Sequence, residues 1–343
     1  MKLPPIPDLR DAALDAALQR AIDHKTKPQG SLGRIEQLAL QAGRVLGTDK
    51  PKLVQPQLVV FAADHGIAAH GVSAFPQEVT GQMVRNFLAG GAAVSVLARQ
   101  HGLAMTVVDC GVACDFEPHP QLRPLKVAKG AADPATGPAM SRGQCEAAMR
   151  HGMELVQGLP GNALLVGEMG IANSSPAALL LARLTGAPLG ECVGRGTGLD
   201  DAGLQRKKDV LQRVLDRHAD ARAPLDALAA FGGLEIATMA GAILQAASER
   251  RIVVMDGFIT GAALLVAHAV APHVVQRCIF SHRSAEPGHA LMLGALGARP
   301  LLELDLRLGE GSGAALAWPL VVSACMLLCD MATFDSAQVS GKH

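Results

Sequence analysis

The sequence has very few aromatic side chains and no excess of either charge. Its 343 residues include one tryptophan and no tyrosine, and 31 lysine and arginine residues balance 31 aspartate and glutamate residues. Proteins that bind single-stranded nucleic acid need aromatic stacking surfaces and a positively charged groove, and this composition offers little material for either. The balanced charge also gives no general attraction to an anionic membrane surface. We therefore expect no nucleic-acid partner.

The cysteines form no recognisable disulfide or zinc pattern. There are seven of them, an odd number without any Cys-x-x-Cys pair, so a disulfide framework of the secreted type is not indicated. Cys110 and Cys114 have helical spacing, as do Cys325 and Cys329, but both pairs lack the further ligands of a zinc site. We interpret them as small buried side chains, and we expect a reducing, cytoplasmic location.

Long hydrophobic runs are also missing. The longest uncharged apolar run covers residues 314–329 and contains Pro319, and it is shorter than the roughly 20 residues of a transmembrane helix. Residues 1–7 contain no apolar core of signal-peptide length. The sequence therefore predicts neither a membrane span nor a secretion signal.

Short apolar runs typical of buried parallel strands alternate with helical patterns over most of the chain. We predict strands at residues 58–63, 104–109, 163–166, 252–255, 274–280 and 301–304. We predict helices at residues 11–24, 32–45, 77–100, 141–157, 176–184, 204–218, 234–248, 261–269, 285–296 and 314–331. This alternation predicts an α/β fold, with a three-layer Rossmann-like domain built on a mostly parallel sheet.

A small helical domain is expected to form from the two ends of the chain. No strand pattern precedes residue 57, so residues 1–49 are predicted to pack as helices together with residues 306–343. Residues 50–305 form the large α/β domain in this scheme. The small domain is expected to complete the active site.

Glycine-rich and polar loops follow several of the predicted strands. They begin near Asp64, Gly167, Asp256, Ser281 and Leu306, and a further glycine cluster covers residues 194–198. Because ligands of open parallel sheets bind beyond the carboxyl ends of the strands, we expect these loops to surround one crevice. Backbone N–H groups in such loops suit a phosphorylated small molecule.

The last of these loops contains a single acid within a glycine frame. Glu310 lies between Gly309 and Gly311, just before an apolar helical run for which Ser312 is the predicted N-cap. Glycine leaves room for a planar ligand to approach the backbone. Taken alone, the pattern is more typical of a tight turn with a solvated glutamate than of a catalytic site.

The common nucleotide-binding, hydrolase and metal-binding motifs do not occur. There is no Walker A sequence and no Gly-x-Ser-x-Gly elbow, and Leu199 stands where a dinucleotide fingerprint would need its last glycine. His65 and His70 are too unfavourably spaced to serve together as metal ligands on one helix. We therefore expect no metal and no cofactor.

One stretch is similar to a known phosphate-binding loop but departs from it. Residues 252–261 resemble the diphosphoribosyl-binding loop of ordinary phosphoribosyltransferases, in which an apolar strand precedes two acids and Thr-Gly. Here Gly257 stands in place of the second acid. Paired acids serve the ribose hydroxyls and the metal–diphosphate complex, so the replacement argues against a diphosphate substrate.

Seven stretches together resemble one enzyme family. They cover residues 26–33, 64–66, 72–76, 167–173, 256–258, 281–286 and 307–317, the last reading Arg-Leu-Gly-Glu-Gly-Ser-Gly-Ala-Ala-Leu-Ala. In this order, and over nearly the whole chain, they are similar to the nicotinate-nucleotide:dimethylbenzimidazole phosphoribosyltransferases, which make the lower-ligand nucleotide of cobalamin. The resemblance implies transfer of ribose 5-phosphate from nicotinate mononucleotide to a benzimidazole. It also implies a homodimer.

The resemblance assigns roles to individual residues. Glu310 would be the general base, and Glu168 would hold the ribose hydroxyls or support that base. Residues implied to hold phosphate and ribose are Gly170, Asn173, Ser174, Gly196, Lys207 and Ser284, with Lys208 as the alternative to Lys207. Residues implied to line the slot for the base are Phe75, Met83 and Leu308.

Two other functions remain open at this point. A phosphoribosyltransferase that uses phosphoribosyl diphosphate would need magnesium and the second acid that Gly257 replaces. A nucleotide sensor without catalysis would keep the phosphate loops but would not need Glu310. The identity of the accepting base, 5,6-dimethylbenzimidazole or a related heterocycle, is not fixed by these residues.

Overall fold

The computed structural model describes residues 1–196 and 198–340, and in these ranges a single parallel sheet organises the fold. Its strands are β1 (Gln57–Ala63), β2 (Ala104–Gly111), β3 (Leu122–Pro124), β4 (Ala163–Met169), β5 (Ile252–Met255) and β6 (Cys278–Phe280). They lie in the order β3-β2-β1-β4-β5-β6, and each neighbouring pair is parallel. The order reverses direction between β1 and β4, as in doubly wound nucleotide-binding sheets. The predicted Rossmann-like α/β fold is confirmed.

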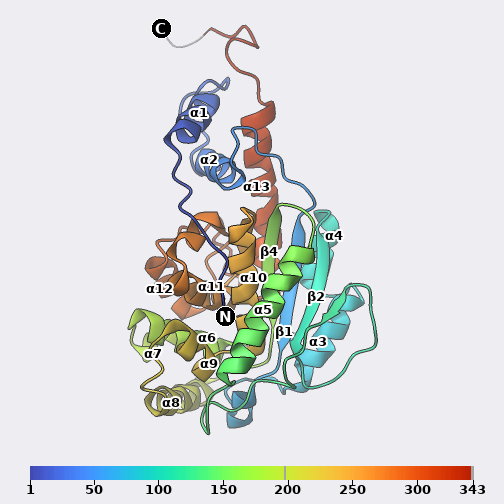
Figure 1. Ribbon diagram of the computed structural model, residues 1–343, viewed down its shortest axis with the longest axis vertical. Coiled ribbons are helices and arrows are strands. Elements are labelled where there is room, and N and C mark those ends of the chain that lie inside the picture. The colour runs from blue at the N-terminus through green and yellow to red at the C-terminus, as the bar shows by residue number, and fades with distance from the viewer. Residues whose placement is uncertain (197, 341–343) are drawn as a thin grey trace.

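The strands bury side chains on both faces of the sheet, which separates the protein into three layers (Figure 1). In β1, Val59 and Phe61 belong to one hydrophobic core, and Leu58 and Val60 belong to the other, as the period of two along a strand requires. Helices covering the first face are α5 (Arg142–Gly158), α6 (Ser174–Thr185), α7 (Leu189–Cys192), α8 (Asp201–Arg217), α9 (Pro224–Phe231), α10 (Leu234–Ser248), α11 (Phe258–Val270) and α12 (Pro287–Ala295). Helices covering the second face are α1 (Ala12–Asp23), α2 (Arg34–Leu46), α3 (Glu78–Leu88), α4 (Ala93–Gln100) and α13 (Ser312–Asp330).

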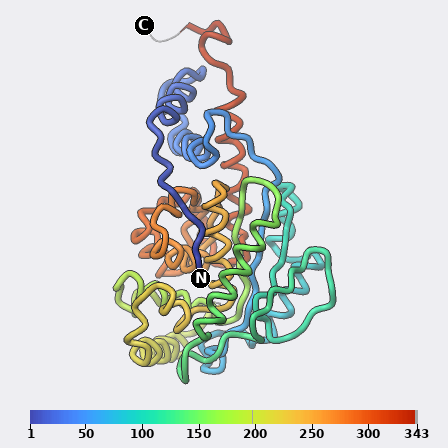
Figure 2. The backbone as a smooth tube through the Cα atoms, in the orientation of Figure 1, coloured from blue at the N-terminus to red at the C-terminus, as the bar shows by residue number. Residues whose placement is uncertain are grey.

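The segment that follows α1 pairs with the segment that follows α13, at one end of the molecule (Figure 2). The Thr26 N–H donates to the Ala332 carbonyl at 3.0 Å, and the Phe334 N–H donates to the His24 carbonyl at 3.1 Å. Helix α2 also reaches the amino end of the sheet, where Gln41 Nε2 donates to the carbonyl of Cys278, the first residue of β6, at 2.9 Å. This contact places α2 at the end of the sheet opposite to the carboxyl ends of the strands. The proposed boundary at residues 50 and 305 remains a prediction.

Helix α13 combines a membrane-like composition with a place in the core. Among the described residues it is the one helix long and apolar enough to cross a bilayer, and 56% of its most apolar window is buried within the protein. Ala314, Ala315 and Trp318 pack into the same core as α2 and the sheet. A buried helix of a globular protein has this composition for the same reason, because apolar residues cover most of its surface.

Three predicted elements differ from the structure. The helix expected over residues 77–100 is two helices, α3 and α4, because Gly90 between them adopts a positive φ of 77°. The strand expected over residues 274–280 is a 3-10 helix, η2 (Pro272–Arg277), followed by the short strand β6. The strand expected over residues 301–304 is reduced to one isolated bridge between His282 and Leu302.

Other elements had no clear pattern in the sequence. Strand β3 lies inside the proline-rich segment 111–139, and helix α9 and the 3-10 helix η1 (Gly66–His70) were also not predicted. Strand β3 has only three residues and pairs with β2 alone, at the edge of the sheet. Such a short edge strand depends on its neighbour rather than on a pattern of its own.

Two glycines allow α5 and α10 to touch along their backbones. A Cβ atom on Gly152 of α5 would lie 1.8 Å from the Thr238 carbonyl oxygen, and one on Gly241 of α10 would lie 2.0 Å from the Met149 carbonyl oxygen. Both contacts are with backbone, which cannot rotate away. The first face of the sheet is therefore covered by a helix pair that only glycine at these positions permits.

Replacing Gly152 with alanine is expected to separate α5 from α10 and to lower the free energy of unfolding by about 1–3 kcal/mol through overpacking. Denaturant unfolding would measure the change. Gly158→Ala is the matched control, because it lies on the same helix and its added Cβ would meet nothing within 4 Å. Equal destabilisation by both substitutions would show that the close contact is not the cause.

Candidate active site

A cavity lies beyond the carboxyl ends of β4, β5 and β6, where the sequence predicted a crevice. It holds about 730 Å³ of space, part of it open to solvent. Its walls come from residues 72–73, 168–174, 196, 257–259, 282, 284, 286 and 307–309. The loops after three strands, the glycine cluster and the loop before α13 therefore do converge. From the segment that follows β1, residues 72–73 line the cavity, whereas residues 64–66 do not.

The loop after β4 supplies one wall. Glu168 lies near the end of β4 and is 6% exposed, and Asn173 Nδ2 donates a hydrogen bond to Glu168 Oε2. Burial raises the pKa of Glu168 to about 8, and the nearby carboxylate of Asp256 adds to the effect. At Gly170 a Cβ atom would lie 2.5 Å from the Ala63 carbonyl oxygen, so the loop crosses β1 only because this position is glycine.

A buried ammonium group lies behind Ser174 and Gly196, two residues of the cavity wall. Lys207 of α8 is fully buried, and its Nζ donates to Ser174 Oγ at 2.8 Å and to the Gly194 carbonyl at 3.3 Å. Lys208 is partly exposed. A Cβ atom on Gly196 would lie 3.0 Å from Ser174 Oγ and 3.5 Å from Lys207 Nζ, so these three residues come together. Burial lowers the pKa of Lys207 to about 8, and an anion in the cavity would favour its charged form.

The loop after β6 supplies the opposite wall. The backbone N–H of Ser284 donates to His289 Nδ1 at 2.8 Å, and the Glu286 N–H donates to Ser284 Oγ at 3.3 Å. Burial raises the pKa of Glu286, while the charges of Lys207 and Arg307 act in the opposite direction. Ser284, Glu286 and Arg307 all line the cavity, so this end holds charges of both signs.

The N-terminus of α13 is capped by an acid that is distant in sequence. Asp256, which follows β5, accepts hydrogen bonds from the N–H groups of Gly311 at 3.2 Å, Gly313 at 2.7 Å and Ala314 at 3.1 Å. The predicted cap, Ser312, is instead the first helical residue, and its hydroxyl donates to the Gly309 carbonyl at 2.6 Å. A carboxylate satisfies several free N–H groups at once and complements the helix dipole, which explains the exchange of roles.

This cap holds Glu310 in an unusual position. Glu310 has a positive φ of 66°, is 6% exposed, and its Oε2 has no hydrogen-bond partner among the described residues. Burial raises the pKa of Glu310 to about 7, and the carboxylate of Asp256 adds to the rise. The neighbouring residue Gly309 lines the cavity. Glu310 is therefore a desolvated acid beside the cavity with one oxygen available.

The glycines around Glu310 allow its loop to lie against β4. A Cβ atom on Gly309 would lie 2.3 Å from Glu168 Oε1, and one on Gly167 would lie 2.3 Å from the Glu310 carbonyl oxygen. Glycine at both positions thus allows the Glu310 loop to approach the end of β4 closely, which places this loop beside Glu168. The sequence had suggested that the glycines gave clearance for a flat ligand.

The residues predicted to line a base slot are not brought together. Leu308 lines the cavity and is 55% exposed. Phe75 is 51% exposed and is not among the lining residues, and Met83 is a partly buried residue of α3 that packs against the second core. Of the three, only Leu308 lies where a ligand in this cavity would touch it.

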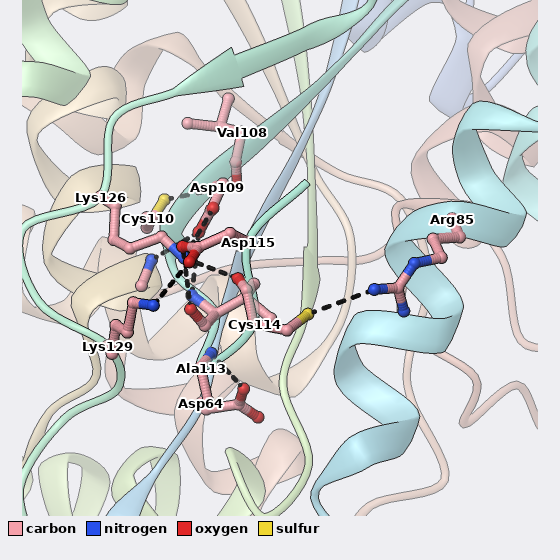
Figure 3. A network of polar contacts seen from close by, with 12 residues as sticks. Asp64, Arg85, Val108, Asp109, Cys110, Ala113, Cys114, Asp115, Lys126 and Lys129 are labelled. Atoms are coloured by element: carbon pink, nitrogen blue, oxygen red, sulfur yellow. Dashed lines mark hydrogen bonds and ion pairs between the residues drawn. The ribbon is translucent and has the colours of Figure 1, made fainter. Parts of the chain in front are cut away.

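The polar residues after β1 hold neighbouring chain segments together. His65 Nε2 lies 2.8 Å from Glu235 Oε1, with both side chains buried, and His70 Nε2 lies 2.8 Å from Asp133 Oδ2. The two histidines therefore pair with different carboxylates, and they do not face a shared ion. Asp64 Oδ2 accepts the N–H of Ala113 at 2.7 Å, beside a second network around Asp109 (Figure 3).

Several cavity residues had no assigned role in the sequence analysis. His282, Glu286 and Arg307 line the cavity, and Asp256 organises it from beneath. His282 and Glu286 fall within the stretch 281–286 that resembled the family, so position after a strand was the signal that could have identified them.

Comparisons with known proteins agree on one family. A phosphoribosyltransferase family model matches residues 7–339. The nicotinate-nucleotide–dimethylbenzimidazole phosphoribosyltransferase of Variovorax paradoxus is 64% identical, over 99% of this chain and 97% of that protein. The enzyme of the same name from Cupriavidus necator is 57% identical over 99% of each chain. A crystal structure of the enzyme from Thermus thermophilus superposes with a TM-score of 0.91 at 42% identity, covering 97% of this chain and 100% of that one.

Asp256→Asn is expected to lower the free energy of unfolding by about 1–3 kcal/mol, because the amide would turn an N–H donor toward one of the three backbone donors. Thermal unfolding would measure the loss. Asp11→Asn is the control, since Asp11 caps α1 at the surface and asparagine is an equally good surface cap. Unchanged stability of Asp256→Asn would mean that the buried cap does not hold α13.

Proposed function

The chain belongs to the phosphoribosyltransferase family of the nicotinate-nucleotide–dimethylbenzimidazole enzymes, and we propose on that basis that its own substrates are nicotinate mononucleotide and 5,6-dimethylbenzimidazole or a related base. The products are then α-ribazole 5′-phosphate and nicotinate, with inversion at the anomeric carbon, in cobalamin biosynthesis. The observation that carries the proposal is the desolvated Glu310 carboxyl, with an oxygen that has no partner among the described residues, beside a cavity whose Ser174 hydroxyl is bound by the buried Lys207.

The phosphate of the nucleotide binds at the lysine end of the cavity in this proposal. Lys207 supplies the charge, and the hydroxyls of Ser174 and Ser284 and the backbone of Gly196 and Gly170 surround the same space. Asn173 holds Glu168 through its amide, which keeps that acid beside the ribose. The fully buried position of Lys207 favours it over Lys208 as the phosphate ligand.

Glu310 acts as the general base. The accepting heterocycle attacks the anomeric carbon through one ring nitrogen. At the same time the bond from that carbon to the pyridinium nitrogen of nicotinate breaks. The N–H proton of the attacking heterocycle passes to Glu310, and the bonding electrons return to the pyridine nitrogen, which leaves uncharged. The leaving group therefore needs no proton and no metal ion. A carboxyl with a pKa near 7 is about half ionised at neutral pH, and the ionised fraction can accept this proton.

The remaining roles are carried by neighbouring residues. Glu168, with its pKa raised to about 8, is protonated in neutral solution and supports the ribose hydroxyls or the base Glu310. Leu308 covers the heterocycle from its exposed position on the cavity wall. Phe75 and Met83 are proposed as further contacts of the heterocycle. For these contacts the bound heterocycle would have to extend toward α3.

Glu310→Gln is expected to reduce kcat for transfer from nicotinate mononucleotide to dimethylbenzimidazole by roughly 10²–10⁴-fold, because the amide cannot take the proton. The wild-type rate should rise with pH and level off above about 7, since only ionised Glu310 is a base. Product analysis by chromatography would follow the reaction. Glu303→Gln, at an exposed acid nearby, is the control. A Glu310→Gln rate close to that of the wild type would refute the assigned base.

We also propose a homodimer that works in the cytoplasm. The free cysteines, most of them buried, suit a reducing compartment, and the family resemblance of the sequence implies a homodimer. Light scattering coupled to size-exclusion chromatography should give twice the 35.5 kDa mass of one chain. A monomer at working concentration would contradict the proposed assembly.

A further inference from the structure

His282 is a cavity residue that the proposed reaction does not use. It follows β6, lines the cavity, and is 2% exposed. Its Nδ1 atom lies 3.1 Å from Ser281 Oγ and 3.9 Å from Asp256 Oδ1. One ring nitrogen is therefore occupied by protein groups.

The hydrogen bonds around His282 decide which nitrogen carries its proton. The Ser281 hydroxyl has one hydrogen, and it donates to the Asp256 carbonyl oxygen at 3.2 Å. Toward His282 that hydroxyl is then an acceptor, so Nδ1 must be the N–H donor. The carboxylate of Asp256 beside Nδ1 favours a proton at the same place. In neutral His282 the other nitrogen, Nε2, consequently has a free lone pair.

The Cε1–Nε2 edge of the His282 ring lies beside Gly257, and both residues line the cavity. A Cβ atom on Gly257 would lie 3.6 Å from His282 Nε2 and 3.6 Å from the Cβ of Ser284. Gly257 occupies the place of the second acid in the diphosphoribosyl loop that residues 252–261 resemble, and Asp256 is committed to capping α13. The acceptors that paired acids would offer to ribose are thus missing from this loop, and Nε2 is an acceptor beside the vacated position.

We propose that His282 accepts a hydrogen bond from one ribose hydroxyl of the donor nucleotide through Nε2, and thereby selects ribose over deoxyribose. The inference rests on the proposed function for the identity of the sugar phosphate. The ring is held for this task by Ser281 and Asp256 on one side. Gly313 provides the space it needs, because a Cβ there would lie 2.0 Å from Nδ1.

The groups that surround His282 keep it uncharged. Asp256 lies beside Nδ1, and His289 of α12 packs at 6.2 Å between ring centroids. Burial lowers the pKa of His282, although Asp256 acts in the opposite direction, and burial lowers the pKa of His289 to about 3. Glu168 and Glu286, the other acids of the cavity wall, are themselves buried carboxyls with raised pKa values. A neutral imidazole can accept a hydrogen bond from a hydroxyl group, whereas an imidazolium cannot.

The test compares sugars that lack one hydroxyl. Transfer would be measured with nicotinate mononucleotide and with its 2′-deoxy and 3′-deoxy analogues, for the wild type and for His282→Ala. The wild type should discriminate against both analogues, by about tenfold or more in kcat/KM for the hydroxyl bound to His282. In His282→Ala the preference for that one hydroxyl should fall to about threefold or less. The preference for the other hydroxyl should remain.

His289→Ala is the matched control, because it removes a second buried imidazole, from the adjacent helix α12, whose Nδ1 is occupied by the Ser284 N–H. Its rate is expected to fall, but both preferences should stay as in the wild type. Retention of both preferences in His282→Ala, or an equal loss of both, would overturn the proposal.

Two further measurements keep the inference separate from the proposed function and from misfolding. Calorimetric affinities for ribose 5-phosphate and its 2-deoxy and 3-deoxy analogues need no transfer, so the same pattern there would support His282 even if no ribazole phosphate were formed. In the wild type, nitrogen NMR of His282 should show a protonated Nδ1 and an unprotonated Nε2. The opposite tautomer would overturn the assignment without any substitution.

Discussion

The hydrogen bonds from the N-terminus of α13 to Asp256 are the constraint on which the rest of the cavity depends. They join the end of β5 to a helix that begins more than fifty residues later, and they do so inside the protein, where a free N–H group or an isolated carboxylate would be costly. Each partner offsets the cost of burying the other. Because the helix cannot move along its axis without losing these bonds, the Glu310 loop just before it is fixed relative to the sheet.

Glycine then brings that fixed loop against β4. Gly309 and Gly167 allow two acids, Glu310 and Glu168, to lie at the same wall, with Asp256 behind them. Three buried carboxyls this close hold protons more tightly than acids in water, and the raised pKa values of Glu168 and Glu310 follow from that arrangement. A donor with a cationic pyridinium ring would relieve part of the repulsion, and a product whose ring nitrogen is uncharged would not. Under the proposed reaction, the site therefore binds the cationic pyridinium ring of the substrate more favourably than the uncharged ring of the leaving group.

The fold was largely predictable from the sequence, because apolar runs such as residues 58–63 and 163–166 are buried on both faces and leave a strong pattern. Short elements such as β3 were not, since they depend on pairing with a neighbour. For the site, the family resemblance proposed Glu168 and Glu310, and the glycine-rich loops predicted around one crevice include the segments that carry them. The capping role of Asp256 could not be predicted, because it depends on two segments meeting in space while Ser312 satisfied every local rule for a cap. The exposure of the Phe75 side chain could likewise not be predicted, because it depends on the path of its loop in space.

The distance in sequence between Asp256 and its three donors also has a consequence for the growing chain. A ribosome adds roughly 5–20 residues per second, so the 55 residues from Asp256 to Gly311 take on the order of 3–11 s to synthesise. By the later part of that interval all six strands have been synthesised, while the carboxylate has no helix to cap and the acid loop does not yet exist. The protein is thus assembled with its reactive centre last. A nascent chain can acquire most of its core before it has any means of catalysis.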